Sequence, residues 1–141
     1  MTDRLREIID EFQTAPDEFR VEMLVERARQ FPPLPERYRA LREKGLGRVH
    51  ECMAEVYFFP EVADGRVRIH ADIPGEAPTQ RALVGMLMDA YDGAPVEAVA
   101  EIPPDLLRQR GIAPLLGVQR QRGFSGIVAR LQHAVSEASA P

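Results

Sequence analysis

The spacing of hydrophobic residues changes its period twice along this chain, and this restricts the fold more than any other feature of the sequence. Apolar residues first recur as on one face of a helix, at Leu5, Ile8, Ile9 and Phe12. They then alternate with polar residues, as in a half-buried strand, over Arg66–Ala71. Helical spacing returns in the last part of the chain. This order of helices, antiparallel strands and helices predicts an α+β fold.

The helices predicted from this pattern begin and end at recognisable residues. A first helix spans residues 3–13 with Thr2 as its cap, and a second begins at Pro16 and runs to about Phe31. The run Phe31–Pro35 ends the second helix, because proline lacks an amide donor and restricts the residue before it. The second helix is expected to bury Val21, Leu24, Val25 and Ala28. Further helical segments are predicted at residues 36–43, 83–90, 96–100 and 103–110, and in a last helix with Phe124, Ile127, Val128, Leu131 and Val135 on one face.

The strands are predicted between the two helical parts. A strand over Ala54–Phe59 has Pro60 near its end or on an edge, and Asp64–Gly65 is a turn signal before the strand 66–71. A short segment around Arg48–Glu51 adds a third strand. The expected architecture is therefore a small antiparallel sheet of about three strands, with N- and C-terminal helices packed on one of its faces.

Length and composition narrow the class of protein. A chain of 141 residues with 45% hydrophobic and 28% charged residues is expected to form one domain over residues 1–141, and is neither a disordered tail nor a membrane protein. Its amino-terminal segment is charged and amphipathic rather than a signal peptide, so a cytoplasmic location is expected. A net charge of −4 argues against binding to nucleic acid.

The charge is unevenly distributed. No acidic residue lies between Leu106 and Ser136. Such a stretch suits an acidic partner surface or an anionic ligand. The alternative is a compositional bias, since nearly all basic residues of the chain are arginine. The arginines of this stretch are Arg108, Arg110, Arg120, Arg122 and Arg130.

The single cysteine, Cys52, excludes an internal disulfide and any metal or iron–sulfur site built from several cysteines of this chain. It follows a loop punctuated by Gly45 and Gly47 and precedes the first strand. Its neighbours do not continue an apolar run. We therefore expect a thiol that solvent or a partner reaches, rather than one on a core face.

Several segments in a fixed order resemble the SufE/CsdE family of sulfur acceptors. The segment Val49–Tyr57 is similar to the family's active-site motif, Val-x-Gly-Cys-x-Ser-x-Val-Trp. The Leu-Pro segment Phe31–Pro35 precedes it, and the glycine-containing helix Arg81–Leu87 follows. Tyr91–Pro95 resembles a glycine-containing turn of the family, and Gln119–Gly123 resembles its Ser-Arg-x-x-Gly segment. The sequence is therefore identified as a member of this family.

The same segments also depart from the family pattern. Glu51 stands where the family has glycine before the cysteine, Ala54 replaces a serine and Tyr57 replaces a tryptophan. Pro78–Thr79 stands where a Ser-Asp pair is expected. The chain is thus a divergent member. The positions that match are Val49, Cys52, Val56, Arg120 and Gly123.

The resemblance implies a SufE/IscU-like fold and a role in iron–sulfur cluster assembly. Such a protein receives persulfide sulfur on Cys52 from a PLP-dependent cysteine desulfurase (SufS/CsdA-like), stimulates that enzyme, and passes the sulfur on, with a SufB-like scaffold as an acceptor. It is a carrier and activator rather than a free-standing enzyme, and it needs no cofactor or metal of its own. The alternative is a regulatory protein that binds a desulfurase or scaffold without transferring sulfur. Both a monomer and a homodimer fit the resemblance.

The resemblance makes Cys52 the nucleophile and Arg120 a contact for the desulfurase or the active-site loop. His50 and Glu51, beside the thiol, are expected to be further partner-binding residues. Glu51 should raise the thiol pKa by its charge, whereas His50 would offset this if its ring reaches the sulfur, which requires an extended backbone. We predict that Cys52 titrates no lower than an ordinary thiol and is activated at the partner's site. His50 and Cys52 alone are too few ligands for a metal, and no third group is visible for a Cys–His hydrolase.

Overall fold

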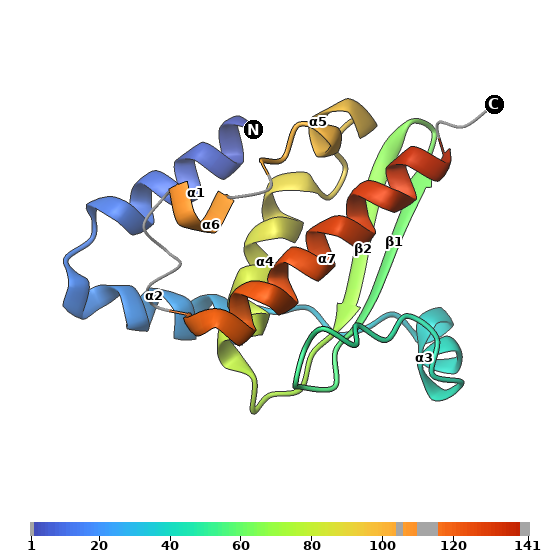
Figure 1. The fold of residues 1–141 in the computed structure, drawn as a ribbon, viewed down its shortest axis with the longest axis horizontal. Coiled ribbons are helices and arrows are strands. Elements are labelled where there is room, and N and C mark those ends of the chain that lie inside the picture. Colours follow the sequence, from blue (N-terminus) through green and yellow to red (C-terminus); the bar gives the residue numbers. More distant parts are fainter. Residues whose placement is uncertain (1, 104–105, 110–115, 139–141) are drawn as a thin grey trace.

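Along the chain, a β-hairpin separates two groups of helices (Figure 1). The computed structural model describes residues 2–103, 106–109 and 116–138. Part of the predicted helix 103–110 lies outside the described residues, namely positions 104, 105 and 110 and the side chain of Arg108. Among the described helices, none combines the length and apolarity needed to cross a membrane. The elements are α1 (Asp3–Thr14), α2 (Asp17–Arg29), α3 (Glu36–Glu43), β1 (Tyr57–Ala63), β2 (Arg66–Asp72), α4 (Pro78–Tyr91), α5 (Val96–Ala100), α6 (Leu106–Gln109) and α7 (Gly117–Ala138).

The hairpin confirms the α+β prediction. Strands β1 and β2 are antiparallel, with Ala63 opposite Arg66. Asp64 and Gly65 both have positive φ, 55° and 73°, as the two central residues of a type I′ turn require. Pro60 lies opposite Ile69 within β1. Because each strand of a two-stranded sheet has one free edge, the missing amide donor of Pro60 is tolerated there.

The predicted third strand is reduced to a single bridge. In the described residues the sheet has 2 strands, and Arg48 alone pairs with Tyr57. The chain then turns, since the Cys52 amide donates to the Val49 carbonyl at 3.2 Å. A backbone bent into a turn cannot extend the ladder, so the prediction of about three strands was wrong by one strand.

The main core lies between the hairpin and two long helices. Helix α7 packs on β1, and α4 packs on β2, so that both cover the same face of the hairpin (Figure 1). Helices α1 and α2 pack mainly on α4 rather than on the sheet. The inward residues of β2 follow the predicted alternation, and those of α1 are the four predicted apolar ones. The first strand begins at Tyr57 rather than at Ala54 and runs on to Ala63, and Phe58 and Phe59 are both buried in it, so the alternation predicted there was wrong. The buried residues on these elements include Phe58, Val67, Ile69, Ala71, Leu5, Ile8, Ile9 and Phe12.

The opposite face of the hairpin is also partly covered, which the sequence did not predict. Tyr38 of α3 stacks on Phe59, with 5.1 Å between ring centroids, and Leu34 completes this small second cluster. Leu34 belongs to the proline-rich run that ends α2. That run therefore brings α3 against the outer face of β1.

Helix α2 is rotated relative to the prediction. Val21 and Val25, expected in the core, are 62% and 37% exposed, and Phe19 is 49% exposed. Ala28 is the one fully buried residue among those described in α2. A helix two layers away from the sheet packs mainly on α4, so half of its apolar residues face away from that helix.

Candidate functional site

Cys52 lies in a short irregular loop, residues 49–56, which joins the turn after α3 to β1. The loop is closed at its base by Val49 and Val56, both fully buried, with the Val49 amide donating to the Val56 carbonyl at 2.9 Å. Gly47 precedes the loop with a φ of +79°, and a Cβ atom there would lie 2.5 Å from the ring of Phe59. Glycine is thus required at position 47, both for its backbone conformation and for the close approach of Phe59.

The structure buries the thiol, contrary to the expectation of an accessible one. Cys52 is 4% exposed. Its Sγ atom lies 3.7 Å from Nε2 of Gln80, a hydrogen-bond contact of a weak sulfur acceptor. A Cβ atom on Gly123 of α7 would lie 2.7 Å from the same Sγ. The thiol is therefore enclosed between the first turn of α4 and the second turn of α7.

Glu51 ties the same loop to the surface of α7. Its Oε1 atom accepts a hydrogen bond from Nη2 of Arg130 at 3.0 Å, and the pair is partly exposed. The other carboxylate oxygen lies over Gly126, at a position that a Cβ atom there would occupy. Because residues 123, 126 and 130 share one face of α7, this helix holds both Cys52 and Glu51.

The environment of Cys52 opposes ionisation of its thiol. Burial is the larger cause that raises the pKa of Cys52, and the negative charge of Glu51 raises it further. The positive charges of Arg130 and Arg48 offset part of this increase. The direction agrees with the prediction that the resting thiol is no stronger an acid than an ordinary one.

The pH profile of Cys52 alkylation should reflect this raised pKa. Because only the thiolate reacts, we expect the rate with iodoacetamide to rise at a higher pH than for the same protein unfolded in urea, where the pKa of Cys52 returns to its ordinary value. Intact mass against time at each pH measures this rate. A midpoint well below about 8 in the folded protein would contradict the assignment of a protonated resting thiol.

The other predicted site residues, His50 and Arg120, lie near the Cys52 loop without contacting the sulfur. His50 is exposed, and among the described residues it has no contact with the sulfur, since the turn at Val49–Cys52 is not the extended backbone that would bring its ring there. Arg120 is exposed in the first turns of α7, where its Nη1 atom donates to the Leu116 carbonyl at 3.4 Å. Arg120 thus lies beside the loop region rather than on Cys52 itself.

A groove of about 420 Å³ opens next to the Cys52 loop, between the start of α4 and the start of α7. Met53 and Val118, which both line it, are 82% and 71% exposed. Arg120 and Glu76 add one charge of each sign, and Gln80 borders it as well as the sulfur. We call this the α4–α7 groove. It places exposed apolar side chains within a few residues of the buried thiol.

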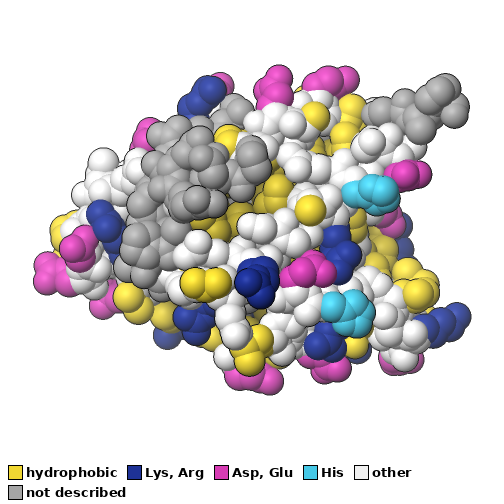
Figure 2. Space-filling model, in the orientation of Figure 1, with side chains coloured by type: hydrophobic (Ala, Val, Ile, Leu, Met, Phe, Trp, Pro, Cys, Tyr) yellow, Lys and Arg dark blue, Asp and Glu magenta, His cyan; other side chains and the backbone are white. Residues whose placement is uncertain are grey.

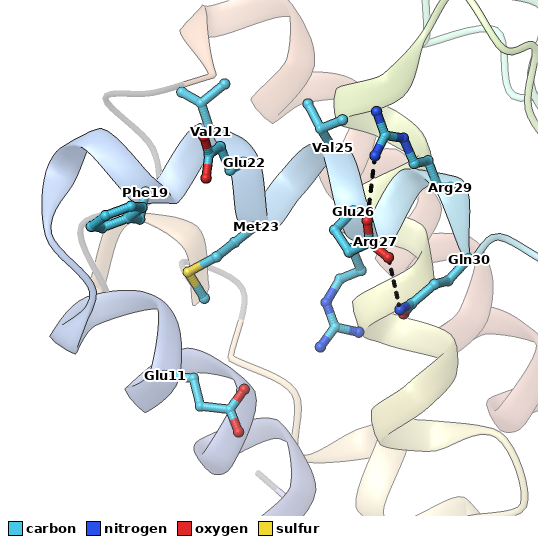
Figure 3. Close-up of a pocket in the computed structure, with 10 residues that line it drawn as sticks. All are labelled: Glu11, Phe19, Val21, Glu22, Met23, Val25, Glu26, Arg27, Arg29 and Gln30. Atoms are coloured by element: carbon cyan, nitrogen blue, oxygen red, sulfur yellow. Dashed lines mark hydrogen bonds and ion pairs between the residues drawn. The ribbon is translucent and has the colours of Figure 1, made fainter.

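A larger groove, of about 710 Å³, lies between α1 and α2, away from the Cys52 loop. Figure 3 shows Met23 of α2 and Glu11 of α1 projecting into it. Its lining belongs to these two helices and to Gln30 at the end of α2. Its lining contains no cysteine or histidine, and its larger volume is no evidence that it takes part in a reaction of Cys52.

Three residues of this site were missed by sequence reasoning: Gln80, Gly126 and Arg130. Gln80 had a visible signal, because it lies three and seven residues before Leu83 and Leu87 and so on the buried face of α4. A polar side chain on the buried face of a helix is expected to have a hydrogen-bond partner. Within the described residues, no group of three or more metal-ligating side chains is present.

A family model and the curated relatives point to one family. Residues 6–135 match the model of SufE, the Fe-S metabolism associated domain. A SufE-like protein of Mycobacterium tuberculosis is 30% identical over 135 residues, which cover 95% of this chain and 92% of the relative. A cysteine desulfuration protein SufE of Plasmodium vivax is 26% identical over 94% of this chain and 52% of its own length. The solution structure of a hypothetical protein from Thermus thermophilus superposes with a TM-score of 0.84 at 34% identity, covering 98% of this chain and 97% of that one.

Proposed function

The chain belongs to the SufE family, and from this premise we propose that it is a sulfur acceptor that takes persulfide sulfur from a cysteine desulfurase on Cys52. The family connects the protein with iron–sulfur metabolism and sulfur transfer. The observation that carries the specific role is the position of the single thiol in an irregular loop, attached to α4 and α7 by side-chain contacts. Contacts of this kind break at a lower free-energy cost than a strand or a helix.

The proposed step exchanges one S–S bond for another. The Cys52 thiolate attacks the terminal sulfur of the persulfide on the desulfurase cysteine. An S–S bond forms to Cys52 Sγ, and the S–S bond of the donor breaks with its electron pair on the donor sulfur, which takes up the proton that Cys52 has lost. The products are the Cys52 persulfide and the donor thiol, with no net oxidation. The desulfurase supplies the PLP chemistry that makes the donor persulfide.

The closed loop sets a condition for this step. A thiol that is 4% exposed cannot meet a sulfur atom on another protein, so the 49–56 loop has to move away from α7. Movement would break the Glu51–Arg130 pair and the Gln80 contact. It would also bring Cys52 into water, which removes the main cause of its raised pKa. Docking would therefore expose and activate the nucleophile in one event.

The test is the intact mass of the protein after incubation with a cysteine desulfurase, PLP and cysteine without reductant. We expect a gain of about one sulfur atom on the parent chain and none on Cys52→Ser. Peptide mapping should place the added sulfur on Cys52. No gain in mass, in a mixture in which the complex demonstrably forms, would contradict the proposed transfer.

Docking is proposed to use the α4–α7 groove, since it adjoins the loop and exposes Met53 and Val118. Figure 2 shows basic and acidic side chains interspersed on the face crossed by α7. Arg130 of α7 is already paired with Glu51. Arg120 has no carboxylate partner among the described residues within ion-pair distance, so its charge is available to an acidic partner.

Arg120→Glu should therefore weaken binding to the desulfurase, and the loss should shrink as salt screens the charges. We expect about a tenfold rise in Kd at low ionic strength, measured by fluorescence anisotropy of a labelled desulfurase. Arg29→Glu on the exposed side of α2 is the matched control. Equal Kd values for Arg120→Glu and the parent chain at low salt would exclude Arg120 from the interface.

One observation favours the alternative, a regulatory protein that binds a desulfurase or scaffold without transferring sulfur. Glu51 replaces the family's glycine next to Cys52 and both raises its pKa and fastens the loop to Arg130. Both effects lower the rate at which Cys52 attacks a persulfide. Complex formation and stimulation by Cys52→Ser distinguish the two functions. For either one, we propose an iron–sulfur scaffold as the component that follows the desulfurase.

A further inference from the structure

Among the described residues, Gln80 is the one amide or charged side chain that is buried, 6% exposed, and only one end of its amide has a partner in the closed fold. Its Nε2 atom lies 3.7 Å from Cys52 Sγ. Its Oε1 atom is buried and has no hydrogen-bond partner within the part of the chain that the structure describes. A buried carbonyl without a donor is costly, and proteins rarely retain one where a leucine would fill the same space.

A persulfide would satisfy both ends of this amide. A thiol carries its acceptor and its donor on one atom, whereas a persulfide carries them on two adjacent atoms, Sγ and the terminal S–H. A side-chain amide likewise presents a donor N–H and an acceptor oxygen side by side in one plane. The Gln80 amide thus complements the –S–SH group better than it complements the –SH group that it faces at rest.

An additional sulfur atom has to lie on the side of Cys52 away from Gly123, because the space between Gly123 and Sγ is already filled. Gly123 presents no side chain to Cys52, and a Cβ atom there would lie 2.7 Å from Sγ and 2.8 Å from Gln80 Nε2. Gln80 also borders the α4–α7 groove of about 420 Å³. The terminal sulfur of a persulfide would therefore point toward this groove, on the side where the Gln80 amide lies.

We propose that Gln80 is a positioning residue that holds the Cys52 persulfide in the closed protein, with Nε2 donating to Sγ and the terminal S–H donating to Oε1. The inference rests on the proposed function, because it concerns the loaded form of the same cysteine. It assigns to Gln80 the retention of the transferred sulfur between its receipt and its delivery. It also explains why a polar side chain is buried at this position of α4.

The experiment compares two rates in Gln80→Leu and in the parent chain. The first is the rate at which the loaded protein loses its terminal sulfur to dithiothreitol. In this reaction the terminal sulfur leaves as sulfide, Cys52 returns to the thiol, and dithiothreitol is oxidised to its cyclic disulfide. The second is alkylation of the unloaded thiol by iodoacetamide. Intact mass follows both. We expect sulfur loss to accelerate about tenfold and alkylation by less than about threefold, because the persulfide loses two hydrogen bonds and the thiol one.

The ratio of the two rates separates retention from a packing role. Loosening of the loop alone would accelerate both reactions equally, and this result would overturn the proposal, as would unchanged rates. Gln30→Leu, the same change at the exposed end of α2, should alter neither rate. Thermal unfolding shows whether Gln80→Leu is folded, and Gln80→Met, which is unbranched like glutamine, replaces it if it is not.

Loading with inorganic polysulfide keeps this test independent of the desulfurase. The Cys52 thiolate attacks a sulfane sulfur, the S–S bond of the polysulfide breaks, and the shortened polysulfide leaves with the electron pair. If the desulfurase fails to load the parent chain, the proposed function is contradicted. The effect of Gln80→Leu on the polysulfide-loaded protein then still decides whether this side chain holds the persulfide.

Discussion

Cys52→Ser is expected to bind the cysteine desulfurase as tightly as the parent chain and to lose all stimulation of it. Serine has nearly the same shape as cysteine, and its hydroxyl oxygen can accept the hydrogen bond from Nε2 of Gln80, so the loop should stay closed and folded. A hydroxyl of ordinary pKa is not ionised at neutral pH and does not accept sulfur from a persulfide. The acceptor reaction, and any turnover that depends on it, therefore stops.

Alanine and sulfide production by the desulfurase measures stimulation, and anisotropy measures binding. Cys52→Ala serves as a second variant that lacks any polar atom at this position. If Cys52→Ser binds and still stimulates, the protein acts on the desulfurase by contact alone and is the regulatory binder rather than a carrier. Loss of both binding and stimulation in each variant would mean that Cys52 itself is part of the interface.

Gly123→Ala and Gly85→Ala are expected to change the protein in opposite directions, although both place alanine in the interior of a helix. Alanine in place of glycine stabilises a helix by about 1 kcal/mol through its propensity. At Gly85 of α4 a Cβ atom would meet its nearest neighbours at 3.9 Å, an ordinary contact, so this gain should appear in full. At Gly123 it would lie 2.7 Å from Cys52 Sγ and 2.8 Å from Gln80 Nε2.

Relief of this overlap at Gly123 requires Cys52 Sγ and the Gln80 amide to move away from α7, which weakens the contact of the loop with this helix. Overpacking of this size costs roughly 1–3 kcal/mol, which cancels or exceeds the gain in propensity. We expect Gly123→Ala to be no more stable than the parent chain and to react at Cys52 at least about tenfold faster. Urea unfolding and iodoacetamide kinetics measure the two effects. A Gly123→Ala protein that is stabilised like Gly85→Ala, with Cys52 still protected, would show that α7 does not hold the loop closed.

Most of the fold was predictable because its signals are local. The apolar face of α1, the Asp64–Gly65 turn and the alternation in β2 all depend on neighbours within one element, and each was confirmed. The face of α2 was not predictable in the same way. Val21 and Val25 have a helical spacing that fits burial, but α2 meets α4 through a different side, and no pattern within α2 encodes that choice.

For the candidate site, too, some features follow from the sequence and others only from the tertiary structure. By itself, the sequence determined that the chain has one thiol, placed in a loop before a hairpin and next to a carboxylate, since these are matters of composition and order. Only the tertiary structure decided that this thiol is closed off, because Gln80 and Gly123 come from helices far along the chain. A nucleophile is a property of one residue, whereas its burial and its pKa depend on every element packed against it.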